Sequence, residues 1–407
     1  MRRDDYALFS PARIGPIEIA NRFVRSATAD LAAWREGAYG PEDTALYRAL
    51  AQGGVGLILA GGMEVIPRKA CDAGTLSGWT FSYDNVRIAG TGTLLCEIRD
   101  VAGDCRIFAQ LECNALIAGD APAGPSAIPS PYFDGHFRAL EAEEIETIID
   151  AFAQAIGRTQ EEGFDGVQLH AAHGGGLWHF LSPHTNKRTD AYGGSARNRT
   201  RIVREIVSRA RETVGAFPIV IKANCTDYLE DGIDREDFHA LAVALEEAGV
   251  DAIEVSGGSW DCLLRSEAQL GFRPVPAAES HTGILDPAKQ AYFLPYVEGL
   301  DLGIPLILVG GIRNVEHAER IIRSNVVQFV AMCRPLIREP DLVARWRDGR
   351  GPVEAACLAC NACIYSMHLP FEELGRRTVT CLPKDNPSLQ AAAQHWLATF
   401  VESVRVG

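Results

Sequence analysis

Eight short apolar segments alternate with longer segments of helical periodicity, and this alternation limits the folds open to the chain. The apolar segments cover residues 22–28, 54–62, 105–111, 165–171, 217–224, 251–258, 304–311 and 326–334. Amphipathic stretches such as 142–163 and 235–250 lie between them, each with a Gly at or next to its end, which is a signal for the end of a helix. Such alternation is typical of a parallel sheet with crossover helices. Eight units of this kind predict an α/β protein with a (β/α)8 TIM barrel.

A doubly wound open sheet is the alternative architecture. Its dinucleotide-binding fingerprint has three glycines, whereas residues 90–95 (GTGTLL) lack the third and lie in helix-like sequence. We therefore predict a barrel domain over residues 1–350 and a C-terminal extension over 351–407. The extension is too short for a second nucleotide-binding domain of ordinary size.

Composition and charge narrow the function classes. Hydrophobic residues make up 47% of the 407 residues, which fits a globular protein with a large core. The net charge of −14 argues against nucleic-acid binding, which needs a basic face. The N-terminus lacks the apolar core of a signal peptide, and no apolar stretch is long enough to span a bilayer. We expect a cytoplasmic protein that acts on a small molecule, away from membranes and nucleic acid.

The predicted strands end in residues suited to binding a planar, phosphate-bearing cofactor. In TIM barrels the chemistry lies at these carboxyl ends, and phosphates bind after strands seven and eight. Gln110 can donate and accept hydrogen bonds, Lys222 can place a positive charge beside an electron-accepting ring, and Arg334 follows the eighth strand. The candidate residues at the strand ends are Ala27, Thr28, Gly62, Gln110, His170, Lys222, Gly310, Gly311 and Arg334.

The sequence resembles the Old Yellow Enzyme family of NADH:flavin oxidoreductases over nearly the whole barrel. The longest matching stretch is 180–201 (FLSPHTNKRTDAYGGSARNRTR). Further matching stretches are residues 8–28, 109–111, 124–129, 164–174, 306–313 and 329–342. The resemblance implies FMN, bound without a covalent link across the barrel mouth, and NADH or NADPH as the reductant.

The resemblance also implies roles for single residues. Ala27, Thr28 and Gly62 would lie along the flavin, and Gln110 and Lys222 would contact its pyrimidine side. The phosphate would be held by Gly310, Gly311, Cys333 and Arg334.

His170 and His173 match the substrate-binding pair of the family. In an enone reduction, hydride from flavin N5 reaches the β-carbon and negative charge develops on the carbonyl oxygen. Two imidazole N–H donors directed at that oxygen would stabilise the charge. We therefore predict reduction of an activated C=C bond, with His170 and His173 as the catalytic residues.

The substrate site departs from the family pattern. Gly175 stands where the family has a tyrosine that protonates the substrate α-carbon, and glycine has no proton to give. Tyr83, Tyr132 and Cys113 are the candidate replacements, and Ala29 stands where a Thr or Cys often tunes the flavin. Two alternatives therefore stay open: an oxidative flavoenzyme that resembles amine dehydrogenases or demethylases, and a flavin or iron–sulfur electron-transfer subunit.

Four of the 11 cysteines are clustered near the C-terminus, namely Cys357, Cys360, Cys363 and Cys381. This spacing suits thiolates that converge on one metal centre, either a 4Fe–4S cluster or Zn²⁺, and unliganded cysteines are the remaining alternative. The run resembles that of the family branch containing trimethylamine dehydrogenase and 2,4-dienoyl-CoA reductase, in which it ligates a 4Fe–4S cluster; here the last gap is several residues longer. A cluster here would take its electrons from a separate redox partner protein. If no cluster is bound, NAD(P)H would reduce FMN directly.

Overall fold

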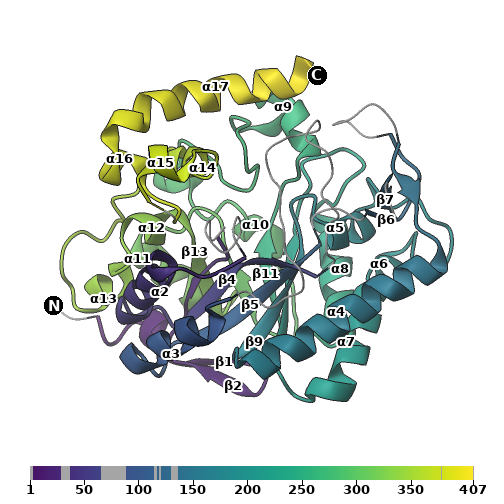
Figure 1. Ribbon diagram of the computed structural model, residues 1–407, viewed down its shortest axis with the longest axis horizontal. Helices are drawn as coiled ribbons and strands as arrows, with labels where there is room; N and C mark the ends of the chain where they lie inside the picture. The colour runs from purple at the N-terminus through teal and green to yellow at the C-terminus, as the bar shows by residue number, and fades with distance from the viewer. Residues whose placement is uncertain are drawn as a thin grey trace.

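The computed structural model describes residues 3–28, 37–65, 89–113, 117–118, 121–129, 136–376 and 378–406. Eight parallel strands close into a barrel, one from each predicted apolar segment, which confirms the predicted fold (Figure 1). In order around the barrel they are β3 (Phe23–Arg25), β4 (Leu57–Glu64), β5 (Arg106–Glu112), β9 (Gly166–Ala171), β10 (Ile219–Asn224), β11 (Ala252–Ser256), β12 (Leu306–Leu308) and β13 (Phe329–Met332).

Helices connect the strands on the outside of the barrel. The longer ones are α2 (Pro41–Gln52), α3 (Thr91–Val101), α4 (Ala142–Glu162), α7 (Arg201–Val214), α8 (Arg235–Glu247) and α11 (Val315–Arg323). Helix α4 begins with a capping box between Glu141 and Glu144 and ends at Gly163, whose φ of 94° few other residues adopt. None of the helices within the described ranges has the length and apolar character needed to cross a bilayer.

The inside of the barrel is apolar at its base. Inward-facing side chains from seven strands form one buried cluster: Val24, Leu57, Leu59, Phe108, Val220, Ala252, Ile307, Phe329 and Ala331. The hairpin of β1 (Ala12–Ile14) and β2 (Ile17–Ile19) closes this base with Ile14 and Ile19. Gly166 is required here, because a Cβ at this position would lie 2.6 Å from the Phe108 ring.

Three excursions from the barrel lie around its mouth. Between β5 and α4 the chain forms a small sheet of β6 (Ile117–Ala118), β7 (Ala121–Gly124) and β8 (Arg138–Ala139). After β9 it forms α5 (Gly176–Leu181) and α6 (Ala196–Arg199). The loop after β11 contains the short helices η2 (Asp261–Leu264) and α9 (Glu267–Leu270).

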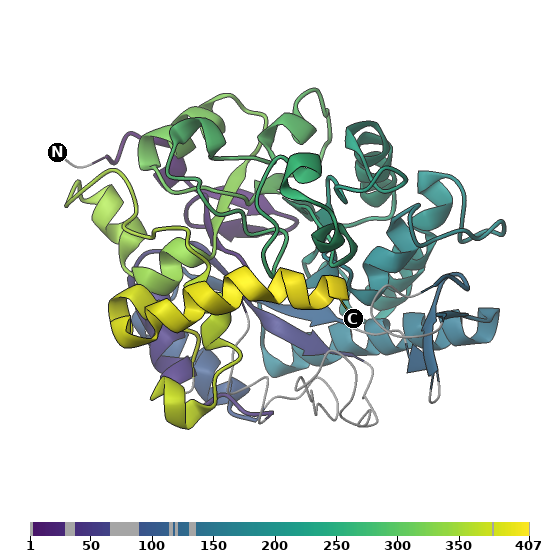
Figure 2. The ribbon, with the colours of Figure 1, turned by 90° about the horizontal axis from the view of Figure 1, so that it is seen from above.

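The chain after β13 continues through α12 (Arg334–Arg338) and α13 (Leu342–Arg347) into the C-terminal extension. The extension contains α14 (Ala362–Ser366), α15 (Phe371–Leu374), α16 (Leu382–Asp385) and α17 (Gln390–Val406), and it has an apolar cluster of its own against which Ile337 of α12 packs. Helix α17, yellow in Figures 1 and 2, runs back across the molecule and contacts η2. The extension therefore packs against both α12 and the loop after β11.

Candidate active site at the barrel mouth and adjoining cysteine cavity

A buried polar layer lies above the apolar base of the barrel. Gln110 Nε2 donates to Gln168 Oε1 at 2.7 Å, and Gln168 Nε2 donates to Glu254 Oε2 at 2.7 Å. Lys222 Nζ lies 3.2 Å from Glu254 Oε1 and donates to Ser26 Oγ at 3.0 Å, while Ser26 Oγ donates to Glu254 at 2.5 Å. All five side chains are buried, and each has at least one hydrogen-bond partner within the layer.

The barrel register places several predicted residues side by side at this level. Gln110 is paired with Gly62 on one side and Gln168 on the other, and Lys222 is paired with His170. The sequence reasoning missed Gln168 and Glu254. Their signal was a polar residue at an inward-facing position within an otherwise apolar strand.

His170 and His173 lie together at the end of β9, with ring centroids 5.3 Å apart and planes inclined by 60°. His173 has a φ of +59°, and its backbone N–H contacts Asn224 Oδ1 at 3.3 Å. Its Nε2 lies 2.7 Å from Ser256 Oγ. His170 Nδ1 is buried and has no hydrogen-bond partner among the described residues. The predicted pair thus lies together, and one of its polar atoms has no partner in the part of the chain that the structure describes.

The surroundings of both imidazoles disfavour the charged form. Burial, and then the charge of Lys222, lowers the pKa of His170 to about 3. The pKa of His173 is also well below its usual value, through burial first and then the charges of Lys222 and His170. Both rings are therefore neutral near pH 7, with one N–H donor and one acceptor nitrogen each.

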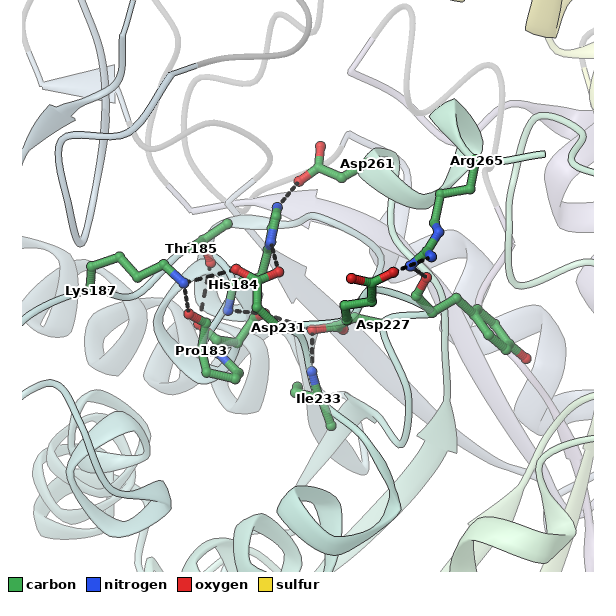
Figure 3. A network of polar contacts seen from close by, with 12 residues as sticks. Pro183, His184, Thr185, Lys187, Asp227, Asp231, Ile233, Asp261 and Arg265 are labelled. Atoms are coloured by element: carbon green, nitrogen blue, oxygen red, sulfur yellow. Dashed lines mark hydrogen bonds and ion pairs between the residues drawn. The ribbon is translucent and has the colours of Figure 1, made fainter. Parts of the chain in front are cut away.

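A buried carboxylate, Asp227, helps to hold the His170–His173 pair in place through Asn224. Asp227 accepts four hydrogen bonds, and Figure 3 shows it in the network beside the mouth. The donors are Trp178 Nε1 at 2.7 Å, Ser182 Oγ at 2.6 Å, Asn224 Nδ2 at 2.7 Å and the Ile233 backbone N–H at 2.9 Å. Burial raises the pKa of Asp227, and the four hydrogen bonds oppose that shift. Through Asn224, this network fixes the backbone of His173.

His184, in the stretch 180–201, connects this stretch to two loops (Figure 3). Its Nδ1 lies 2.6 Å from Asp231 and its Nε2 3.4 Å from Asp261. The hydrogen bond with Asp261, followed by that with Asp231, raises the pKa of His184 to about 9 against the effect of partial burial. Asp261 follows Trp260, whose indole would lie 3.0 Å from a Cβ at Gly174. The ion pair thereby holds the Trp260 loop against the turn that follows His173.

Gly175 lies at the start of α5, directly beside His170. A Cβ at this position would lie 3.2 Å from His170 Cδ2, and its φ of −68° suits any residue. Among the candidate proton donors, Cys113 is fully buried in the large apolar cluster between the strands and the helices outside them. Ala109 and Leu111, at alternating positions of the same segment, belong to this cluster too. Cys113 therefore faces the helices and not the barrel mouth. Tyr83, Tyr132 and Ala29 lie outside the described residues.

The residues predicted to bind the phosphate include one close side-chain contact and two glycines with positive φ. Thr28 Oγ1 lies 3.1 Å from Cys333 Sγ. Gly310 and Gly311 have φ values of 107° and 77°, and Cβ atoms there would lie 2.6 Å from the Phe293 ring and 3.0 Å from the Tyr292 ring. Only glycine combines this backbone conformation with such close approach.

The four C-terminal cysteines line one cavity, together with Arg334 and Arg338 (the cysteine cavity). Arg338 Nη1 donates to Cys381 Sγ at 3.3 Å, and the Ala359 backbone N–H donates to Cys357 Sγ at 3.5 Å. In the part of the chain that the structure describes, no group of three or more His, Cys, Asp or Glu side chains is arranged to hold a single metal ion. The cysteines thus surround a space bordered by two guanidinium groups.

Arg334 joins this cavity to the end of the eighth strand. Its Nη1 donates to Asn361 Oδ1 at 2.6 Å and to the His281 carbonyl oxygen at 2.9 Å. Asn361 lies between Cys360 and Cys363 and also donates to the Ser280 carbonyl oxygen at 2.6 Å. The predicted phosphate residue therefore also holds the cysteine loop in place.

Residues 7–352 match the sequence profile of the NADH:flavin oxidoreductase / NADH oxidase family. The chain belongs to this family. It is 33% identical over 367 residues to an NADH oxidase of Thermoanaerobacter brockii, a match that covers 87% of this chain and 52% of that protein. It is 30% identical over 343 residues to an NADPH dehydrogenase of Bacillus licheniformis, covering 82% of this chain and 91% of that protein.

The fold of this family member also matches solved structures. A 2-naphthoyl-CoA reductase in complex with 2-naphthoyl-CoA superposes with a TM-score of 0.74 at 24% identity, over 92% of this chain and 56% of that one. The chain spans about half the length of several curated relatives it matches, the NADH oxidase included.

The NADH:flavin oxidoreductase family uses FMN and NAD(P)H. The residues at the barrel mouth fit FMN. Gln110 and Lys222 lie in the polar layer, and their carboxamide and ammonium groups are of the kind that could pair with the pyrimidine edge of a flavin. A Cβ at Gly62 would lie 2.4 Å from the Glu112 carboxyl group, so only glycine fits at position 62 beside this side chain.

Proposed function

We propose that this chain reduces an activated C=C bond conjugated to a carbonyl group, as in enones and enoyl compounds, with His170 and His173 binding the carbonyl oxygen. The observation that carries the proposal is the buried Nδ1 of His170, which has no hydrogen-bond partner among the described residues and lies beside a second neutral imidazole. A buried polar atom without a protein partner is typical of a site that completes its hydrogen bonds with a ligand.

The two histidines act as hydrogen-bond donors to the substrate. Because both pKa values are depressed, each ring is neutral and donates an N–H without losing its proton to the substrate. Ser256 occupies Nε2 of His173, so Nδ1 is the nitrogen that faces the substrate. Two such donors stabilise the charge that develops on the carbonyl oxygen, and losing one typically costs about 3 kcal/mol.

The remaining strand-end residues would hold FMN. When bound and reduced by NADH or NADPH, FMN supplies the hydride from N5. Gln110 and Lys222 would bind the pyrimidine edge, and Lys222 adds a positive charge there. Ala27, Thr28 and Gly62 would lie along the ring, and the phosphate would be held by Gly310, Gly311, Cys333 and Arg334.

We also propose that Cys357, Cys360, Cys363 and Cys381 hold a 4Fe–4S cluster. Three observations support this: the four thiols line one cavity, two arginines border it, and a backbone N–H points at the Cys357 sulfur. Cationic side chains and N–H donors offset the negative charge of a thiolate-ligated cluster. The cluster would supply single electrons, taken from a separate redox partner protein.

Oxidation of an amine is the second candidate function, and Gly175 favours it. Oxidation removes hydride from the substrate and needs no proton donor at this position. The Trp260 loop and the His pair would then bind the substrate for hydride removal. In a further alternative, the chain transfers electrons without substrate chemistry of its own.

Anaerobic stopped-flow kinetics test the proposal. The FMN-loaded protein is reduced with NADH or NADPH and mixed with cyclohexenone. We expect the enone to accelerate flavin reoxidation, and His170→Ala to slow this step about a hundredfold. If no enone accelerates reoxidation while a secondary or tertiary amine reduces the oxidised protein, the oxidative function replaces the reductive one. If neither occurs, the electron-transfer role remains.

A further inference from the structure

Glu254 is a fully buried carboxylate that joins two branches of the polar layer. In one branch its Oε2 accepts from Gln168, which in turn accepts from Gln110. In the other branch its Oε1 accepts from Ser26 and Lys222. The carboxylate therefore contacts, directly or through one side chain, both groups that face the pyrimidine edge of a flavin.

The charge of Glu254 dictates which way the two carboxamides point. An ionised carboxylate only accepts hydrogen bonds, so Gln168 must turn its Nε2 toward Glu254 and its Oε1 toward Gln110. Gln110 must then offer its Nε2 to Gln168, and both contacts are 2.7 Å long. Because a carboxamide has its oxygen and nitrogen on opposite sides, the Gln110 oxygen is left outside this chain of hydrogen bonds as a free acceptor.

The same carboxylate fixes the ammonium group. Lys222 Nζ donates to Ser26 Oγ at 3.0 Å and lies 3.2 Å from Glu254 Oε1. The Ser26 hydroxyl, 2.5 Å from Glu254, must donate to the carboxylate and so accepts from Lys222. The directions of these bonds follow from one acceptor-only and one donor-only group.

We propose that Glu254 is a positioning residue for the cofactor: it makes Gln110 present an acceptor oxygen to the flavin N3–H and holds Lys222 beside the same edge. The inference rests on the proposed binding of FMN at the barrel mouth. Glu254 itself does not need to touch the flavin, because its effect passes through Gln168 and Gln110.

Glu254→Gln is the variant that tests the direction of the hydrogen bonds. The new carboxamide keeps its oxygen toward Lys222 and Ser26, so its NH₂ group faces the NH₂ group of Gln168. Two donors cannot share a contact, so Gln168 rotates and Gln110 rotates after it. Gln110 then presents a donor, and not an acceptor, to the flavin N3–H.

The measurement is the dissociation constant of two flavins, FMN and 3-methyl-FMN, from the apoprotein by fluorescence quenching. The wild type is expected to prefer FMN, whose N3–H finds the Gln110 oxygen. In Glu254→Gln this preference should fall about tenfold, which is the coupling expected of contacting groups. A variant that merely loosens the site weakens both flavins by the same factor and leaves the preference unchanged.

A charge swap provides the rescue. In the double variant Glu254→Gln with Gln168→Glu, the carboxylate at position 168 accepts from Gln110 and from the carboxamide at position 254. This arrangement restores the Gln110 orientation, so the preference for FMN should return to within about twofold of the wild type. If Glu254→Gln binds neither flavin, recovery of binding and preference in the swap supports the inference, and failure to recover overturns it.

Glu319→Gln is the matched control. Glu319 is also a buried glutamate, but on α11, where it accepts from the Ala7 and Leu8 backbone N–H groups at 2.9 and 3.0 Å. This variant should lower thermal stability without changing the flavin preference. A wild type that binds neither flavin overturns the proposed function. A wild type that prefers FMN, beside a Glu254→Gln variant with the same preference, overturns only the role of Glu254.

Discussion

His173 Nε2 and Ser256 Oγ lie 2.7 Å apart, and this contact joins the end of β9 to the end of β11 across the intervening β10. It leaves Nδ1 as the His173 atom that can meet a substrate. The ring is neutral, and in the tautomer with the proton on Nδ1 the Ser256 hydroxyl donates to Nε2 and the Nδ1 N–H is left for a substrate.

Removing this hydroxyl should impair catalysis without unfolding the protein. We expect Ser256→Ala to lower kcat/KM for cyclohexenone about fivefold, since a hydrogen bond of about 1 kcal/mol that orients a catalytic donor is lost. Ser256→Thr keeps the hydroxyl and should recover most of the activity. Steady-state kinetics and a thermal unfolding midpoint on each variant check this. Equal losses in the Ala and Thr variants would show that the hydroxyl is not the cause.

Installing a tyrosine at position 175 should supply the missing proton donor. The backbone dihedrals there suit any residue, and the new Cβ would lie 3.2 Å from both His170 Cδ2 and the Ala172 carbonyl oxygen, so these neighbours must shift by a few tenths of an ångström. If the reaction is enone reduction limited by protonation, Gly175→Tyr should raise kcat about a hundredfold, the lower end of general-acid catalysis. Gly175→Phe has the same bulk without the hydroxyl and should give no gain. Equal rates in both variants would mean that protonation is not limiting or that the reaction is an oxidation.

The His184 ion pairs predict a stability that falls in mild alkali. The folded pKa of about 9 lies above the ordinary value of 6.5, so the stabilisation is complete below about pH 6.5 and is lost as the pH rises through 9. We expect a contribution of about 1 kcal/mol, since solvent screens the partly exposed pairs. Urea unfolding of the wild type and His184→Gln at pH 6, 7.5 and 9.5 measures it. The difference between the two proteins should shrink toward pH 9.5, and a constant difference would contradict the assignment.

The proposed cluster predicts a specific spectrum. Anaerobically purified protein should show a broad shoulder near the flavin bands that dithionite bleaches, and Cys363→Ser should lose it together with the bound iron. Cys96, exposed on α3, provides the control, and Cys96→Ser should keep both. Flavin bands alone in the wild type, with no iron by elemental analysis, would exclude the cluster.

The barrel could be predicted from the sequence because each strand is an apolar run between helices, and the strand ends then follow from the fold. The contacts within the polar layer could not. Gln168 and Glu254 lie on β9 and β11, with β10 between them, and they meet only because side chains converge inside a closed barrel.

The same limit applies to Arg334 and Cys113. The sequence placed Arg334 at a phosphate site, whereas its bond to Asn361 depends on how the extension folds back. Cys113 was a candidate proton donor from its position in a motif. Its outward direction follows from the strand register, since Ala109 and Leu111 share that side.

The bond between Arg334 and Asn361 also bears on how the chain can be divided. Arg334 is buried, and the bond crosses the predicted boundary at residue 350. A protein ending there would keep the His281 carbonyl oxygen as a partner of Arg334 but lose the carboxamide of Asn361, a loss that adds to that of the apolar contacts. A substitution that disturbs the cysteine loop therefore also affects the mouth of the barrel, through the bond between Asn361 and Arg334.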